Sequence, residues 1–436
     1  MQADSPLPSL TLTNWRKPFF TIWIGQAFSL LGSSLVQFAL IWYLTEQTGS
    51  GTVLATATLV GMLPQVLFGP IAGTLVDRWN RRVTMMVADG LVALATLILA
   101  VLFASGSIQF WQIYALMFVR SLAGGFHYPA MQAATSLMVP KEQLTRVQGF
   151  NQMLGGLMSI AAPALGALLL SILPMQGILF IDVSTALLAI TPLLFIPVPE
   201  PVRQTQTDTQ STPRSTFWAD FKAGFTYTWN WKGLRAMVLM AALINLMLTP
   251  TFSLLSLLVV GHFKGGPEVL AALEGALGVG VILGGLILGA WGGFKKRIYT
   301  TILGIAGIGI GVTVVGLTPA TWLWLAIAAM FLLGVMNPIT NGPLMAVVQA
   351  AVEPHMQGRV FNLIGSLATA MTPLGLLIAG PLSDWLDIRI WFWVAGVITL
   401  GMAVSGLFNR DLLSLEQEKP AQESSLSAAV VETTGD

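Results

Sequence analysis

The sequence predicts an all-α membrane protein with twelve transmembrane helices in two pseudo-symmetric six-helix bundles. Three observations lead to this fold class. Of the 436 residues, 55% are hydrophobic and only 9% are charged, whereas soluble domains carry about 25% charged residues. Twelve apolar runs are long enough to cross a bilayer, for which about 20 residues suffice. One long polar stretch divides these runs into two sets of six.

The apolar runs follow one another closely within each half of the chain. In the first half we expect spans near 19–44, 52–76, 84–105, 109–138, 147–172 and 177–196. In the second half we expect them near 236–260, 268–292, 299–317, 321–350, 360–380 and 390–409. The fourth run contains Pro129 and the tenth contains Pro338 and Pro343, so these should be long, kinked helices.

Five regions follow from these spans. They are a cytoplasmic N-terminus at 1–18, a six-helix bundle at 19–196, a cytoplasmic linker at 197–235, a second six-helix bundle at 236–409 and a disordered cytoplasmic tail at 410–436. The first part of the linker has few apolar residues, which predicts disorder. The second part spaces Phe217, Phe221, Phe225 and Trp229 at helical intervals. This spacing favours a short helix lying in the membrane interface.

Positive charge is unevenly distributed among the loops. Eighteen of the 21 Lys and Arg residues lie in the termini, the linker and the loops after even-numbered spans. Only Lys264 and Arg389 lie in loops after odd-numbered spans, and Arg120 lies inside a span. Cytoplasmic loops carry the excess of Lys and Arg in membrane proteins. We therefore expect a multi-pass protein of the cell (inner) membrane with both termini in the cytoplasm.

Composition argues against several kinds of partner and site. A net charge of +1 offers no basic field for nucleic acid. The absence of cysteine excludes thiolate metal sites, and the three histidines lie far apart in the sequence, so we expect no metal. No G-x4-G-K-[ST] stretch is present. We therefore expect no cofactor, with the proton gradient as the driving force.

The two halves of the chain repeat one pattern of glycines and basic residues. GPIAGTLVDRWNRR at 69–82 aligns with GLILGAWGGFKKR at 285–297, which places Gly73 on Gly289. The acid Asp77 is not repeated in the second copy. Two halves related by a repeat are typical of secondary transporters, whose binding site lies near the bilayer midplane between the repeats.

The loop after the second span resembles the signature loop of the major facilitator superfamily, a glycine followed four residues later by D-R-x-x-R-R/K. The matching residues are Gly73, Asp77, Arg78, Arg81 and Arg82. Asn80 stands where the family usually has glycine. The resemblance implies the major facilitator fold and a cytoplasmic gate that latches in the outward-open state.

Further stretches extend the resemblance along nearly the whole chain. Arg120 and the glycines after it resemble the fourth-span motif of the family. The fifth span matches the antiporter motif at Gly149, Pro163 and Gly166 but departs from it at other positions, which leaves a strict antiporter assignment open. Three stretches resemble the Mef-type macrolide efflux proteins, namely IWIGQAFSLLGSSLVQFALIWYLTEQTGS, GGFHYPA and GRVFNLIGSLATAMTPLGL.

Charged side chains inside spans are costly and mark functional sites. Arg120 is interpreted as a central charge coupled to proton movement, with a packing role as the alternative. Glu274 and Asp182 are interpreted as protonatable carboxylates near the outer ends of their spans. Snorkelling of Glu274 to the outer water and interfacial capping by Asp182 stay open. Asp89 is expected to pair with the loop arginines of the gate, with proton transfer as the alternative.

Polar anchors in an apolar wall are expected to line a substrate cavity. By resemblance to the superfamily, the first, fourth, seventh and tenth spans line it, with contributions from the fifth and eleventh. The candidates are Gln26, Gln37, Phe38, His127, Asn245, Asn337, Asn341, Asn151 and Asn362. The position of His127 beside Pro129 favours a structural hydrogen bond across the kink over a proton relay.

Together these features predict a secondary active efflux transporter that works as a monomer in the lipid bilayer. It would export a small amphipathic, macrolide-type compound in exchange for protons by alternating access. A siderophore or a lysophospholipid is the alternative cargo, and a transport-inactive sensor or scaffold is the alternative of another class. No set of nucleophile and base is visible in the loops, so an enzyme is not expected.

Overall fold

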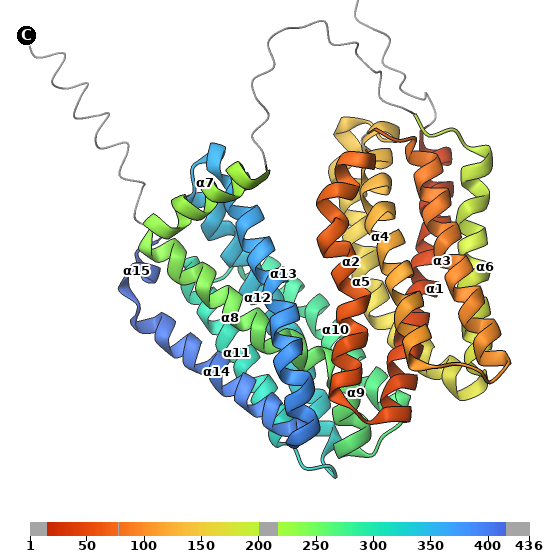
Figure 1. Cartoon of the computed structure of the whole chain (residues 1–436). Coiled ribbons are helices and arrows are strands. Elements are labelled where there is room, and N and C mark those ends of the chain that lie inside the picture. Colours follow the sequence, from red (N-terminus) through yellow and green to blue (C-terminus); the bar gives the residue numbers. More distant parts are fainter. Residues whose placement is uncertain (1–14, 77, 200–216, 416–436) are drawn as a thin grey trace, which may run out of the picture. The chain divides into compact units, whose positions relative to one another are not determined.

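The computed structural model describes residues 15–76, 78–199 and 217–415, which form helices joined by short connections (Figure 1). Most of the linker segment for which we predicted disorder and residues 416–436 of the predicted tail lie outside these ranges, and so does Asp77. The first residues of that tail are described and form the helix α15 (Arg410–Leu413), which differs from the predicted disorder. The structure confirms the predicted all-helical class, because no strand occurs within the described ranges.

Eleven helices in the described part of the chain are long and apolar enough to cross a membrane. The twelfth expected span, α4 (Phe110–Met138), is 29 residues long but is not one of the eleven. It carries Arg120 and His127, which lower its apolar character. These polar side chains make α4 a candidate wall of a polar site.

The chain forms two compact units. Unit 1 comprises residues 1–44 and 57–206, and unit 2 comprises residues 45–56 and 207–436. The helices of the first half are α1 (Arg16–Thr48), α2 (Gly51–Val76), α3 (Arg81–Ala104), α4 (Phe110–Met138), α5 (Lys141–Ile172) and α6 (Met175–Phe195). Within unit 1, α3 packs against both α4 and α6. Phe19, Met85, Ala134 and Leu193 belong to a buried apolar cluster of this unit.

The turn between α2 and α3 is built from residues of the basic loop. Asn80 is the N-cap of α3, and its side-chain oxygen accepts a hydrogen bond from the backbone nitrogen of Val83 at 3.0 Å. Asparagine is among the best N-cap residues, which explains its presence where the family usually has glycine. Arg82 donates to the carbonyl oxygens of Leu193 and Leu194 in the last turn of α6. The loop thus joins two helix ends of unit 1.

Unit 2 holds the helices of the second half. They are α7 (Phe217–Asn230), α8 (Lys232–Ser253), α9 (Leu255–Leu258), the π-helical turn η1 (Val259–Phe263), α10 (Pro267–Trp291), α11 (Arg297–Leu317), α12 (Leu323–Ala351), α13 (Pro354–Trp385), α14 (Ile388–Phe408) and α15 (Arg410–Leu413). The helix α7 occupies the place predicted for an interfacial helix, and its location in a membrane stays a prediction. The region predicted as one span at 236–260 is interrupted, because α8 ends at Ser253 and the chain goes on as the short α9 and η1.

Glycines allow the helices of unit 2 to pack at short distance. A Cβ atom on Gly280 of α10 would collide with the carbonyl oxygen of Phe331 of α12. A Cβ atom on Gly334 of α12 would collide in turn with the carbonyl oxygen of Leu277. Glycine at such contacts lets two helix backbones approach closely. A residue with a side chain at either position would push α10 and α12 apart.

The start of α2 belongs to unit 2 and is capped there by an acid of α13. The Asp384 carboxylate accepts hydrogen bonds from the backbone nitrogens of Gly51 at 2.6 Å and Thr52 at 3.1 Å. A carboxylate satisfies the free N–H groups of a helix N-terminus and complements its dipole. This contact explains why residues 45–56 are grouped with the second half of the chain.

Candidate functional site

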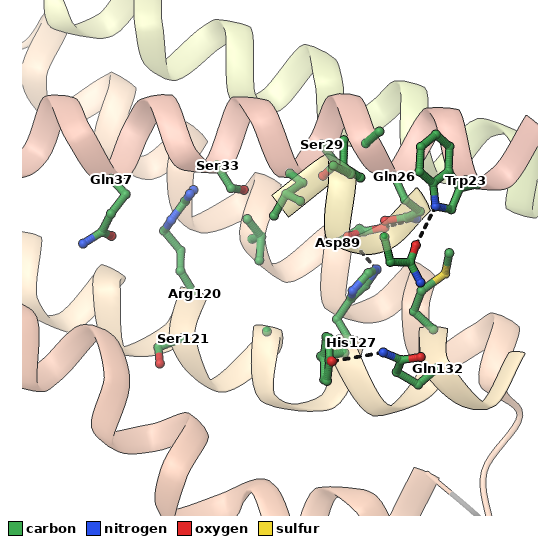
Figure 2. A pocket seen from close by; sticks show the side chains of 18 of the residues that line it. Trp23, Gln26, Ser29, Ser33, Gln37, Asp89, Arg120, Ser121, His127 and Gln132 are labelled. Carbon is green, nitrogen blue, oxygen red and sulfur yellow. Dashed lines mark hydrogen bonds and ion pairs between the residues drawn. The ribbon is translucent and has the colours of Figure 1, made fainter. Parts of the chain in front are cut away.

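A cavity of about 550 Å³ lies within unit 1. Most of its polar lining comes from α1, α4 and α5, and α3 adds one carboxylate (Figure 2). The polar residues are Gln26, Ser29, Ser33, Gln37, Asp89, Arg120, Ser121, His127, Tyr128, Gln132, Thr135, Gln148, Asn151 and Gln152. Apolar residues such as Leu30 and Met117 complete the wall. The cavity therefore combines apolar surface with fixed polar and charged groups, as small-molecule sites do.

The polar lining of α1 follows the period of a helix. Gln26, Ser29, Ser33 and Gln37 are spaced by three, four and four residues, which places them on one face. Sequence reasoning identified the two glutamines but not the two serines. The helical spacing was the signal that could have identified all four.

Asp89 of α3 is a buried carboxylate in the cavity wall, with 6% of the residue exposed. Its Oδ2 accepts a hydrogen bond from Nε2 of Gln26 on α1 at 2.9 Å. Its Oδ1 lies 3.4 Å from Nε2 of His127 on α4. Figure 2 shows Asp89 between these two side chains. Three helices thus bring one acid, one imidazole and one amide together.

Two predictions about these residues differ from the structure. We expected Asp89 to pair with the loop arginines, but its contacts are Gln26 and His127. We also expected His127 to form a structural hydrogen bond across the Pro129 kink, but its Nε2 faces Asp89. The reason is the packing of α3 against α4, which turns Asp89 toward the cavity. The short distance in sequence between Asp89 and the basic loop did not predict the direction of its side chain.

Arg120 of α4 forms an ion pair with Asp182 of α6, with 2.5 Å between Nη1 and Oδ2. The Asp182 side chain is completely buried, whereas that of Arg120 is 11% exposed and borders the cavity. The same carboxylate accepts hydrogen bonds from Thr96 Oγ1 at 2.8 Å and Ser33 Oγ at 3.0 Å. A buried charge is tolerated when it is paired and hydrogen-bonded. Asp182 is therefore the saturated counter-ion of Arg120, not an interfacial cap.

Thr96 and Ser33 were not predicted as site residues. Each hydroxyl meets Asp182 only because α1, α3 and α6 pack together. No motif in the sequence identifies them, since single hydroxyl residues are common in apolar helices. The Arg120 guanidinium also contacts the Thr96 hydroxyl. Ionic and hydrogen bonds thus join one side chain from each of α1, α3, α4 and α6, namely Ser33, Thr96, Arg120 and Asp182.

The remaining predicted cavity residues fall into two groups. Asn151 of α5 lines the cavity and accepts a hydrogen bond from Trp23 Nε1 at 2.8 Å. Phe38 does not line it, because its ring packs against Gly166 of α5. The others belong to unit 2 and lie outside this cavity: Asn245, Asn337, Asn341 and Asn362.

The asparagines of unit 2 make local contacts. Asn245 donates to the carbonyl oxygen of Ala241, and Asn341 donates to that of Asn337, in each case one turn earlier in the same helix. Glu274 lies partly buried on α10 and forms no hydrogen bond or ion pair with another described residue. The structure thus gathers the polar candidates of unit 1 around one cavity and leaves Phe38 and Glu274 apart from it.

The predicted gate and hinge residues are only partly described. Asp77 lies outside the described residues, Arg78 is exposed, and Arg81 is buried at the start of α3. A Cβ atom added to Gly73 or to Gly149 would lie more than 4 Å from any described atom that could hinder it, so neither glycine makes a close helix contact here. Pro163 lies inside the continuous helix α5.

The chain is similar in sequence and in fold to known transporters. The family described as Major Facilitator Superfamily matches residues 22–373. Macrolide efflux protein A from Streptococcus pyogenes is 34% identical over 391 residues, which cover 90% of this chain and 95% of that protein. Multidrug efflux pump Tap from Mycolicibacterium fortuitum is 26% identical, over 93% of this chain and 99% of that protein. A crystal structure of a POT family transporter in complex with 5-aminolevulinic acid has a TM-score of 0.69 at 12% identity, covering 90% of this chain and 96% of that one, which supports the fold alone.

Proposed function

This chain belongs to the Major Facilitator Superfamily, and we propose that it exports an amphipathic, macrolide-type compound in exchange for protons by alternating access. It is a multi-pass membrane transporter rather than an enzyme. The family match confirms the resemblance seen in the loop after the second span. The observation that carries the cargo is the similarity to macrolide efflux protein A along nearly the whole of both chains.

The cavity of unit 1 supports a drug-sized cargo. Its volume of about 550 Å³ falls within the range of about 300–1,000 Å³ that is common for ligand pockets. Its apolar wall suits a hydrophobic ring, and its amides and hydroxyls offer hydrogen bonds. Soft side chains such as Met117 and Met131 in the lining can adapt to an irregular ligand.

Proton exchange is proposed because ionisable groups lie inside the spans. Buried acids and imidazoles at membrane depth are typical of proton relays in transporters. Unit 1 holds two such groups, the Arg120–Asp182 pair and the Asp89–His127 pair. Glu274 of α10 is a third candidate. In this proposal the transporter uses no cofactor and takes its energy from the proton gradient.

We propose the cell membrane as the location, with a monomer whose termini are both cytoplasmic. The distribution of lysine and arginine supports this orientation. The loop at 78–82 would then face the cytoplasm, and Asp77 with its arginines would act as the gate. Asp77→Asn should impair transport without reducing membrane insertion, as measured by export and by the amount of protein in isolated membranes.

A transport assay in cells tests the proposed function. The full chain is expressed in a host that lacks its own drug pumps, and accumulation of labelled erythromycin is measured with and without a protonophore. We expect low accumulation that rises when the proton gradient is removed. Arg389→Gln, which removes an exposed ion pair at the start of α14, is the control variant for expression.

Three results would contradict parts of this proposal. Export that persists without a proton gradient would exclude proton coupling. Unchanged erythromycin accumulation, with movement of a labelled siderophore or lysophospholipid instead, would exclude the macrolide-type cargo. Movement of none of the three would favour a sensor or scaffold.

A further inference from the structure

The two acids of unit 1 differ in how fully their oxygens are satisfied. Asp182 accepts from Arg120, Thr96 and Ser33, and none of its side chain is exposed. Asp89 accepts one hydrogen bond, from Gln26, and borders the cavity. Its remaining oxygen faces His127 Nε2 at 3.4 Å. Asp89 therefore has an acceptor site left for a cation, whereas Asp182 has its carboxylate occupied.

The imidazole beside Asp89 is also unsatisfied. His127 Nε2 is buried and makes no hydrogen bond with a described residue, although it lies within ion-pair range of Asp89. A buried polar atom without a partner is costly and calls for an explanation. When Nε2 of a neutral imidazole carries no hydrogen, it has nothing to donate to the Asp89 oxygen. The imidazolium carries a hydrogen on both ring nitrogens and can donate one to Asp89.

The charges around the cavity fix how many positive charges this pair can take. The charged and titratable groups of the described lining are Asp89 of α3 and Arg120, His127 and Tyr128 of α4; α1, α2 and α5 contribute none. Arg120 is neutralised by Asp182. With His127 neutral, one negative charge is left, on Asp89. One proton on His127, or one ammonium group on Asp89, cancels it, and both together would leave an excess positive charge.

On this basis we propose that Asp89 and His127 form the exchange site, at which the protonated amine of the substrate displaces one proton. This proposal rests on the proposed function and names the residues that couple its two ions. The substrate ammonium donates an N–H hydrogen bond to Asp89. His127 then loses its proton to cavity water, since a second cation beside the ammonium is unfavourable in a site of low dielectric. Charge is conserved, with one cation entering and one proton leaving.

Gln26 is a positioning residue in this proposal. Its amide holds Asp89 Oδ2 at 2.9 Å, which leaves Oδ1 directed at His127. Asp89→Asn retains an acceptor oxygen for Gln26 and the same size, but removes the charge. The variant should therefore fold, and Asp89→Glu is a second variant that keeps the charge while shifting it by one methylene.

The first experiment measures proton release by the purified full chain in weakly buffered detergent. Erythromycin, which has a tertiary amine, is compared with a derivative in which an acetyl group replaces one N-methyl group, so that its nitrogen is a non-basic amide. We expect about one proton released per amine bound, and none with the neutral derivative. Asp89→Asn should lose the release and bind erythromycin about tenfold to a hundredfold more weakly, the value of one charge-assisted hydrogen bond. Its affinity for the neutral derivative should be unchanged.

His127→Gln should release no proton when erythromycin binds, because it lacks the group that gives up the proton. Asp387→Asn, at an exposed loop position of unit 2, is the control and should behave as the parent. A merely structural role for Asp89 would weaken both ligands equally. Proton release by Asp89→Asn equal to that of the parent would overturn the proposal.

A second measurement needs no substrate, so the two proposals can fail separately. The imidazole signals of His127, followed by NMR of labelled histidine in the ligand-free chain at one fixed pH, should differ between the parent and Asp89→Asn. Unchanged imidazole signals would overturn the exchange site even if the cells export erythromycin. Changed signals in a chain that exports nothing would support the pair and overturn the proposed function.

Discussion

The helices α3 and α11 are the third spans of the two halves, and they hold their bundles together by different means. Each packs between two neighbours, α3 against α4 and α6, and α11 against α12 and α14. α3 offers the polar side chains of Asp89 and Thr96 to its neighbours. α11 offers glycines, and 67% of the residues in its most apolar stretch are buried.

The packing of α11 shows what replaces polar contacts in unit 2. A Cβ atom on Gly304 would collide with Thr340 of α12, and one on Gly309 would come within 2.8 Å of Leu400 of α14. Close backbone approach supplies van der Waals contact, which drives helix association where lipid offers no hydrophobic gain. Of these two helices, α3 carries an ionisable side chain to its neighbours, while α11 relies on close packing of its backbone.

The largest expected effect comes from breaking the ion pair of unit 1. Arg120→Ala leaves the fully buried charge of Asp182 with only two hydroxyl donors. Breaking a buried pair in this way costs about 3–5 kcal/mol, so the unfolding free energy should fall by about that amount and transport should be lost. Thermal unfolding of the purified protein and drug accumulation in cells measure the two effects.

Arg120→Lys is the matched variant for this prediction. It retains a positive charge near Asp182 and should recover most of the stability, but not the planar geometry of the guanidinium. If Arg120→Ala unfolds at the same temperature as the parent, the pair does not stabilise unit 1. That result would contradict the role of polar contacts in the comparison of α3 with α11.

A glycine substitution tests the other half. Gly280→Leu places a side chain against the Phe331 carbonyl of α12. Such overpacking costs about 1–3 kcal/mol, and the melting temperature should fall accordingly. Gly285→Leu on the same helix is the control, because an added Cβ there has no described atom within 4 Å. Equal melting temperatures for both variants would contradict a role for glycine in packing α10 against α12.

A smaller effect is expected at the acid of unit 2. If the exchange chemistry resides in unit 1, Glu274→Gln should reduce efflux less than Asp89→Asn does, by under about tenfold or 1.4 kcal/mol. Efflux rates at matched expression measure both. A Glu274→Gln variant that loses all proton-driven export while Asp89→Asn retains it would reverse the assignment of the two units.

The smallest effect is expected at the exposed turn before α14. The hydrogen bond from the Arg389 side chain lowers the pKa of Asp387. Because the pKa is lower in the folded state, the stabilisation is present above the unfolded value of about 3.9 and is lost as the pH falls through the folded value. Exposed pairs contribute about 0–1 kcal/mol. Asp387→Asn should therefore unfold within a few degrees of the parent at pH 7, with the difference vanishing at low pH; a large difference at pH 7 would contradict this.

The sequence by itself determined the fold class and most of the helix ends. Apolar runs of sufficient length specify helices in a bilayer, since a lipid-exposed backbone must satisfy its own hydrogen bonds. α4 and α12 run through Pro129, Pro338 and Pro343 as single helices, as predicted. Where prediction was less accurate, at 236–260, the helix ends at Ser253 and a π-helical turn follows.

Only the tertiary structure decided which polar side chains meet. Gln26, Asp89 and His127 are separated by tens of residues and come together because α1, α3 and α4 pack side by side around the cavity (Figure 2). The sequence identified Arg120 and Asp182 separately by their cost in a membrane, but not as partners. A charge inside a span indicates that a partner must exist. Which face of the helix the charge occupies, and which neighbour meets that face, is set by packing.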